Sequence, residues 1–179
     1  MPEALYFTDD DEANVLLARD PMALLIGFAL DQQVPVQKAF SGPKVILERT
    51  GTLEARRLAE LDLEDAFRER PAIHRFPGAM ARRVRELAQV VIEEYGGDAS
   101  RVWTEAADGD DLRRRIGSLP GFGEMKVKAL GSVLAKRFGV AQAQALVPSH
   151  PTLGDVDCAE ALASYQAAKR EYKASLKAR

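Results

Sequence analysis

Helical periodicity runs through almost the whole chain, and no alternation of period two lasts long enough to predict a strand. The run MALLIGFALDQQ is apolar nearly all round, which is typical of a helix buried at the centre of a domain. Asp20 and Pro21 precede this run as an N-cap residue and a proline at the first helical position. The sequence therefore predicts an all-α fold.

The other helices are expected wherever apolar residues recur at helical spacing between turn signals. We expect them over about residues 10–19, 35–49, 53–61, 63–70, 79–95, 100–106, 110–116, 124–139 and 158–176. Gly42 and Pro43 are expected to break or kink the second of these helices, and Thr52 to cap the third. Residues 140–154 form the least regular segment.

Cysteine content and the N-terminal residues exclude several classes of protein. The single cysteine, Cys158, excludes an internal disulfide and also an iron–sulfur cluster, which needs several thiolates. No apolar run approaches the ~20 residues of a membrane span. The acidic start MPEALYFTDDDEAN lacks the basic and apolar regions of a signal peptide. We therefore expect a cytoplasmic protein with no cofactor, no bound metal and no membrane partner.

Charge is distributed unevenly along the chain, although its sum is close to zero. The formal net charge is −2, from 25 basic and 27 acidic residues, which argues mildly against a general polyanion binder. Acidic residues dominate the start, whereas basic residues gather later, at Arg82, Arg83, Arg85, Arg113, Arg114, Arg115, Lys126, Lys128, Lys136, Arg137 and from Lys169 onward. These clusters indicate either solvated helix faces or one basic surface for an anionic partner.

The stretch LPGFG, residues 119–123, interrupts the helical pattern at a cost in stability. Pro120 cannot donate a hydrogen bond, and Gly121 and Gly123 lose much backbone entropy on ordering. The two glycines permit a close approach of the backbone to another molecule, and the following helix offers unpaired N–H groups. Such a turn predicts a cradle for a phosphate group. The alternative is a helix–helix turn whose glycines serve only tight packing.

The unit DLRRRIGS–LPGFG–EMKVKALGSVL resembles the helix-hairpin-helix motif of DNA-binding proteins. Upstream, DPMALLIGFALDQQVPVQKAF resembles an early helix of the base-excision glycosylases that carry this motif, of the endonuclease III type. That resemblance implies a two-lobed fold. Residues 20–139 would form a helical barrel lobe with the motif at about 110–138, and residues 1–19 and 140–179 a smaller lobe.

The resemblance also assigns residues to a DNA surface. Gln33, preceded by Gln32, matches a glutamine that reaches into DNA beside a flipped base, and capping of the helix end is its structural alternative. The loop residues His74 and Arg75 match positions of DNA contact. His74 is also a candidate proton donor to a leaving purine or a locally hydrogen-bonded histidine. The hairpin supplies the remaining candidates, which are Leu119, Gly121, Phe122, Gly123, Met125, Lys126 and Lys128. Phe122 and Trp103 are expected to serve packing more than base stacking.

One departure from the family concerns the nucleophile. Bifunctional members carry a lysine two residues after the second hairpin glycine, where this chain has Met125. Lys126 follows, and one residue turns a side chain by ~100° around a helix. A Schiff-base mechanism is therefore not expected, and the chain is closer to monofunctional members that release a base without cutting the strand. Lys126 and Lys128 then serve as phosphate contacts or solvated charges.

A monofunctional glycosylase needs a carboxylate near the sugar, because the transition state resembles an oxocarbenium ion. The family places an aspartate at the start of the helix after the hairpin, and GDVDCAEAL is the comparable string. Asp157 is the first candidate and Asp155 the second. Asp157 with Glu160 also fits a capping box, which is a purely structural role.

The expected function is that of a monomeric, nucleoid-associated glycosylase acting on double-stranded DNA that contains damaged or mismatched bases. Two alternatives remain open. The first is a non-catalytic helix-hairpin-helix module that binds distorted duplex DNA. The second is a helical interaction domain that binds no DNA. The sequence does not identify the base that is recognised.

Overall fold

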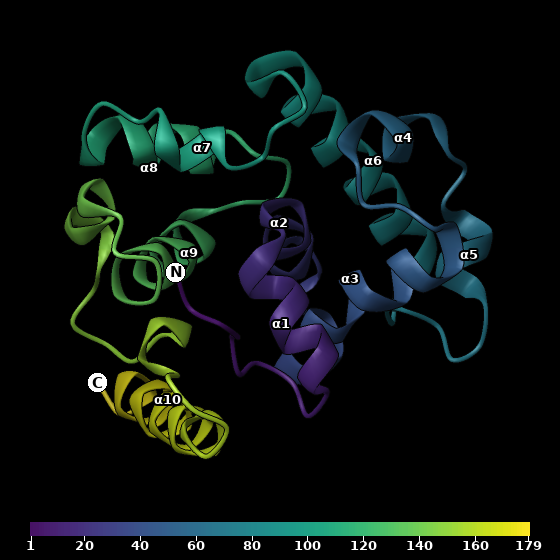
Figure 1. The fold of residues 1–179 in the computed structure, drawn as a ribbon. Helices are drawn as coiled ribbons and strands as arrows, with labels where there is room; N and C mark the ends of the chain where they lie inside the picture. The colour runs from purple at the N-terminus through teal and green to yellow at the C-terminus, as the bar shows by residue number, and fades with distance from the viewer.

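The computed structural model describes all 179 residues and contains helices and turns but no strand (Figure 1). The all-α prediction is confirmed. The α-helices are α1 Asp11–Arg19, α2 Pro21–Leu30, α3 Val36–Thr50, α4 Ala55–Glu60, α5 Glu64–Arg68, α6 Pro77–Tyr95, α7 Arg101–Thr104, α8 Gly109–Gly117, α9 Glu124–Lys136 and α10 Ala161–Lys177. Two short 3₁₀ helices, η1 Ala141–Leu146 and η2 Leu153–Asp155, connect α9 to α10.

Helix α2 lies at the centre because its sequence leaves no polar side. The Asp20 carboxylate accepts hydrogen bonds from the amides of Met22 at 2.9 Å and Ala23 at 3.3 Å, as the sequence predicts. Every residue of α2 after Pro21 is buried. Figure 1 shows α1 and α2 between the group α3–α6 and the group α7–α9. The C-terminal end of α2 thereby comes within reach of α9.

The contacts between helices cross the domain boundaries that the resemblance implies. Helix α1 packs on α2 and α3, while η1 and η2 pack on α9 and α10 contacts η2. One hydrophobic cluster of 47 buried residues joins these elements. It includes Phe40, whose ring lies 5.0 Å from those of both Phe7 and Phe28. The division into a lobe of residues 20–139 and a lobe from both termini stays a prediction.

Helix α3 continues through Pro43, so the expected break does not occur there. Two other local predictions were wrong. Helix α4 begins at Ala55, so Thr52 accepts the Glu54 amide at 3.0 Å outside the helix. No capping box joins Asp157 to Glu160, and α10 begins after both, at Ala161. The box forms earlier, between Thr152 and Asp155, because these residues close the η2 turn.

Taken one at a time, none of the helices is both long and apolar enough to cross a bilayer. Helices α1 and α2 reach that length and composition only as a pair, which is bent by 115°. Both helices pack into the shared core described above.

Candidate nucleic-acid interface

The hairpin between α8 and α9 is anchored from inside and open to solvent outside. Leu119 and Phe122 are buried, and the Phe122 amide donates to the Leu119 carbonyl at 3.1 Å. Gly121, with φ at 78°, and Gly123 are both exposed. The side chains of Leu119 and Phe122 therefore pack in the core, as does Trp103, and those two side chains are not DNA contacts. Only the backbone of this turn is available to a ligand.

Several amides at this corner have no partner within the protein. The amides of Gly121 and Gly123 make no hydrogen bond, and neither do those of the first three residues of α9, Glu124, Met125 and Lys126. Unpaired N–H groups at a helix start carry partial positive charge, which the helix dipole reinforces. Five adjacent free donors on an exposed turn form a surface that suits an anionic oxygen.

Arg83 on α6 lies directly against this corner. A Cβ atom on Gly121 would stand 1.7 Å from a guanidinium nitrogen of Arg83, so a side chain at position 121 would displace the arginine. By contrast, a Cβ on Gly123 would meet nothing within 4 Å. The turn thus needs glycine at position 121, because a side chain there would strain the backbone and clash with Arg83. At position 123 a side chain would clash with no other part of the protein and would point into solvent.

The end of α2 presents Gln32 and Gln33 near the hairpin helix. Gln33 is exposed and adopts a left-handed backbone with φ at 57°, the one residue other than glycine to do so. The Lys126 amine donates to the Ala29 carbonyl at 3.2 Å. The hairpin lysine is thus tied to the last turn of α2, a few residues before the two glutamines. The Gln32 amide lies 3.3 Å from the Met80 sulfur of α6, and neither glutamine lines a cavity with Lys126.

His74 fixes this end of α2 from behind. Its Nε2 lies 3.0 Å from the carbonyls of both Leu30 and Gln32, and its Nδ1 accepts the Phe76 amide at 3.0 Å. Two carbonyl partners require a proton on Nε2, and an amide partner requires a bare Nδ1, so the ring is neutral. Burial also lowers the pKa of His74. The side chain is 2% exposed and fully engaged, which agrees with the alternative of a locally hydrogen-bonded histidine and leaves no free ring nitrogen for DNA contact or proton donation.

Arg75, the neighbour of His74, points outward instead. It is exposed, and its guanidinium lies 5.3 Å from the centre of the Phe76 ring, which is 40% exposed. This loop therefore offers a cation and an aromatic ring at the surface. Arg75 remains a candidate contact.

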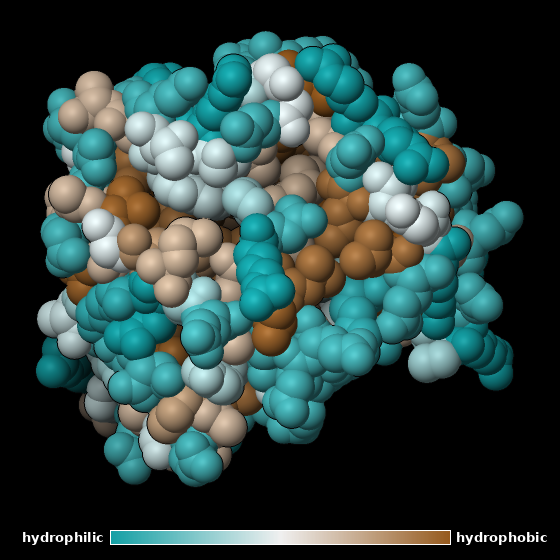
Figure 2. Space-filling view, in the orientation of Figure 1, coloured by the Kyte–Doolittle hydropathy of each residue, from teal (hydrophilic) through white to brown (hydrophobic).

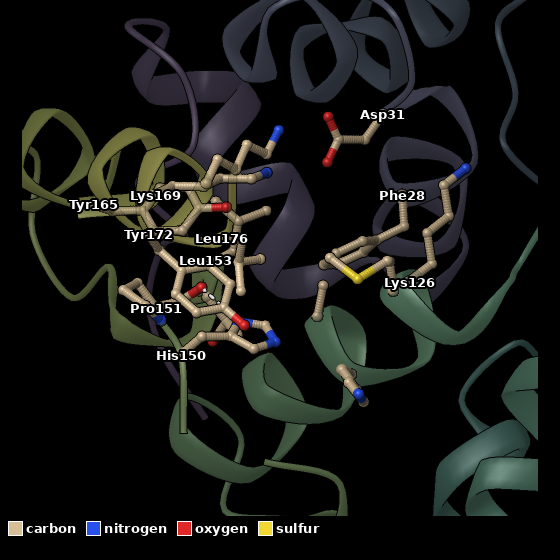
Figure 3. Close-up of a pocket in the computed structure, with 15 residues that line it drawn as sticks. Phe28, Asp31, Lys126, His150, Pro151, Leu153, Tyr165, Lys169, Tyr172 and Leu176 are labelled. Atoms are coloured by element: carbon tan, nitrogen blue, oxygen red, sulfur yellow. Dashed lines mark hydrogen bonds between the residues drawn. The ribbon is translucent and has the colours of Figure 1, made fainter. Parts of the chain in front are cut away.

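A cavity of about 390 Å³ opens between the end of α2, the first turns of α9 and one side of α10. Figure 3 shows side chains from all three elements pointing into it. Its aromatic lining includes Phe28, Tyr165 and Tyr172, and the Tyr172 ring stacks on His150 at 5.0 Å. Its charged lining consists of Asp31, Lys126, Lys128, Lys169 and Lys173.

The two best-shielded charges in this cavity have shifted pKa values. Burial lowers the pKa of Lys126 to about 8, against the attraction of Asp31. Burial raises the pKa of Asp31, against attraction from Lys169, Lys126 and Lys173. Both shifts report a site partly shielded from water, where charge interactions are stronger than at the open surface.

Met125 lies at the rim of the cavity and is 63% exposed. Figure 2 shows apolar areas that cross the middle of one face of the molecule between hydrophilic margins. A large exposed apolar side chain next to unpaired amides and lysines fits contact with a base or sugar. Lys128, one turn of helix away from Glu124, also lines the cavity.

Neither of the two predicted carboxylates lines this cavity. One oxygen of Asp155 accepts a hydrogen bond from the Lys136 amine and the other accepts the Thr152 amide at 2.9 Å. Although partial burial opposes ionisation, these bonds lower the pKa of Asp155. Asp157 is exposed and has no hydrogen-bond partner. Asp155 thus has a structural role in the η2 turn.

Sequence reasoning missed Asp31 and the α10 residues Tyr165, Lys169, Tyr172 and Lys173. Asp31 had a signal, because it follows ten helical residues without a charge and directly precedes Gln32. No sequence signal marked the α10 residues as part of a site, since their spacing is that of any amphipathic helix. No group of three or more His, Cys, Asp or Glu side chains is arranged to hold a metal ion.

Comparison with known proteins gives no match to a family model, to a curated protein or to a solved structure.

Proposed function

We propose that the protein binds double-stranded DNA through the hairpin and acts as a monofunctional DNA glycosylase. The observation that carries this proposal is that two features lie side by side at the start of α9. Five unpaired amides lie at its start, and the lysine-lined cavity opens beside its first turns. Phosphates bind unpaired amides and lysines, and an enzyme that acts on a base must extrude it into a pocket.

Each element has a defined part in this proposal. The hairpin amides and Arg83 hold a phosphate of one strand, and the lysines of α9 and α10 hold the strand on either side of the cavity. In this proposal Gln33, exposed on a left-handed turn after α2, enters the space that the extruded nucleotide leaves. Aromatic rings of the cavity supply a surface on which a base can stack. The preferred substrates are duplexes with damaged or mismatched bases, because these cost least to unstack.

Base release without strand cleavage follows from the chemistry of α9. Met125 has no amine with which to form a Schiff base, and the Lys126 amine is directed to the Ala29 carbonyl of α2. Hydrolysis by water then replaces attack by an amine. We expect borohydride to trap no covalent adduct on abasic DNA, and an adduct lost in Lys126→Ala would contradict the monofunctional assignment.

A non-catalytic module that binds distorted duplex is the second candidate. It is favoured by one observation, namely that both aspartates at the family's expected place lie outside the cavity. Binding of lesion-containing duplexes without release of any base would select this candidate.

The test of the proposal compares two glycine substitutions, one at the end of the turn and one six residues before it. Gly123→Ala places a methyl group on the free-amide surface without an internal clash, whereas Gly117→Ala places one 3.7 Å from Val127, an ordinary contact, before the turn. We expect Gly123→Ala to weaken duplex binding about tenfold or more and Gly117→Ala to leave it unchanged. Base release is then measured on duplexes carrying uracil, alkylated purines or oxidised bases. Unaltered mobility of duplex DNA with wild-type protein at low salt would exclude DNA binding altogether.

A further inference from the structure

The cavity holds one carboxylate among four lysines, and this imbalance restricts what it can bind. Asp31 is the only acidic residue of its lining. None of Lys126, Lys128, Lys169 and Lys173 forms an ion pair, although ion pairs occur at many other places in the molecule. A site with several unpaired cations favours an anionic ligand. The single carboxylate must therefore face a part of that ligand that is not anionic.

Asp31 is placed to act on a ligand and not to hold the fold together. The attractions that it receives from Lys169, Lys126 and Lys173 are charge attractions without a hydrogen bond. Figure 3 shows its carboxylate turned into the cavity on the side of Lys169. The residue is half-buried at the end of α2, where its backbone amide donates to the Phe28 carbonyl at 3.2 Å. The side chain is thus positioned by the backbone while its oxygens remain free.

A DNA strand matches this pattern of charge. Its phosphates recur on either side of each sugar, so lysines from α9 and from α10 can pair with successive phosphates. The sugar between them is neutral in the substrate and positive at C1′ in the transition state of base release. A fixed carboxylate shielded from water stabilises such developing charge more than one at the surface.

We infer that Asp31, and neither Asp155 nor Asp157, is the carboxylate that faces C1′ of the extruded nucleotide. This inference rests on the proposed function and assigns its catalytic residue. As the bond from C1′ to the base nitrogen breaks, its electron pair leaves with the base, which takes a proton from solvent. A water oxygen forms the new bond to C1′, and Asp31 accepts the proton that this water loses. Asp31 then returns the proton to solvent, so one water is consumed for each base released.

The experiment measures recognition of positive charge at the sugar. Two duplexes are compared, one with a pyrrolidine ring at the abasic position, which is cationic, and one with a neutral tetrahydrofuran ring. We expect wild-type protein to bind the pyrrolidine duplex at least about tenfold more tightly. Asp31→Asn, which keeps the shape and removes the charge, is expected to abolish this preference, and Asp31→Glu to retain part of it. Asp155→Asn and Asp157→Asn are expected to keep the full preference.

Two binding results would overturn the inference. One is a wild-type protein with no preference for the cationic duplex, and the other is a preference that survives in Asp31→Asn. Binding of the tetrahydrofuran duplex by Asp31→Asn at wild-type affinity shows that the variant is folded, and circular dichroism provides the same check without DNA. Base release is scored separately on the lesion panel. If wild type releases a base and Asp31→Asn does so equally well, the proposed function stands and this residue assignment fails.

Discussion

The amine of Lys126, in the first turn of α9, donates a hydrogen bond to the carbonyl of Ala29, in the last turn of α2, at 3.2 Å. This bond ties the helix of the hairpin to the helix that carries Asp31 and the two glutamines. It also holds a half-buried ammonium group in the wall of the cavity. Lys126 thus adds a polar link between the hairpin helix and the end of α2 to the packing of Leu119 and Phe122 in the core.

Lys126→Met is expected to change how stability depends on pH. The folded-state pKa of Lys126 is about 8, below the ordinary lysine pKa of 10.5, so the unfolded chain binds more protons between these values. The lysine thus contributes a rise in stability from pH 8 to pH 10 that the methionine variant lacks. Urea unfolding of both proteins at pH 7.5, 8.5 and 9.5 measures this difference. Parallel stability curves for the two proteins would contradict the shifted pKa.

His74→Ala is expected to destabilise the protein by about 2–4 kcal/mol, because it leaves the Gln32 carbonyl and the Phe76 amide unpaired, removes one of the two partners of the Leu30 carbonyl and opens a cavity in a buried region. The wild-type protein is also expected to lose stability as the pH falls through ~6.5, the ordinary histidine value. The pKa of His74 is lowered by burial, so below ~6.5 the unfolded chain binds the proton first. Urea unfolding at pH 7.5 and pH 5.5 tests both statements. A pH dependence that is identical in His74→Gln would assign the loss to other groups.

Substituting the two hairpin glycines is expected to change the stability of the protein by different amounts. Gly121→Ala forces a side chain into a left-handed backbone, at a cost of about 1–2 kcal/mol, and also displaces Arg83. Gly123→Ala meets no atom and has φ at −83°, so a change within about 0.5 kcal/mol is expected. Thermal unfolding of the two variants provides the comparison. Equal destabilisation would mean that the turn is not built as described.

Lys128→Met is expected to weaken duplex binding equally for all sequences and to reduce its salt dependence. Each phosphate contact that is lost lowers the slope of log affinity against log salt by about 0.9. Lys128 is suited to this test because it lines the cavity and has no ion pair whose loss would affect folding. Arg113→Met is the control, since Arg113 already pairs with Glu124. An unchanged salt slope in Lys128→Met would remove this lysine from the interface.

The sequence by itself determined the helical elements and the exposed turn. Asp20 with Pro21 starts α2, and the absence of any polar side on α2 places it in the core, because local hydrogen bonds and burial leave no alternative. The glycines at 121 and 123 predicted a turn that is bare toward solvent, and the structure has one. The expected break at Pro43 does not occur because packing on α2 holds α3 together through a residue that weakens an isolated helix.

Only the tertiary structure decided which side chains share a site. The sequence left His74 either as a DNA-facing residue or as a locally hydrogen-bonded one, and it is buried because its loop folds against the carbonyls that end α2. Asp155 and Asp157 were favoured by their place in the sequence, but the η2 turn uses one and leaves the other outside the cavity. Asp31 meets Lys126 and Lys169 only because α2, α9 and α10 converge. Convergence of distant segments depends on how whole helices pack, and periodicity records only which side of each helix is buried.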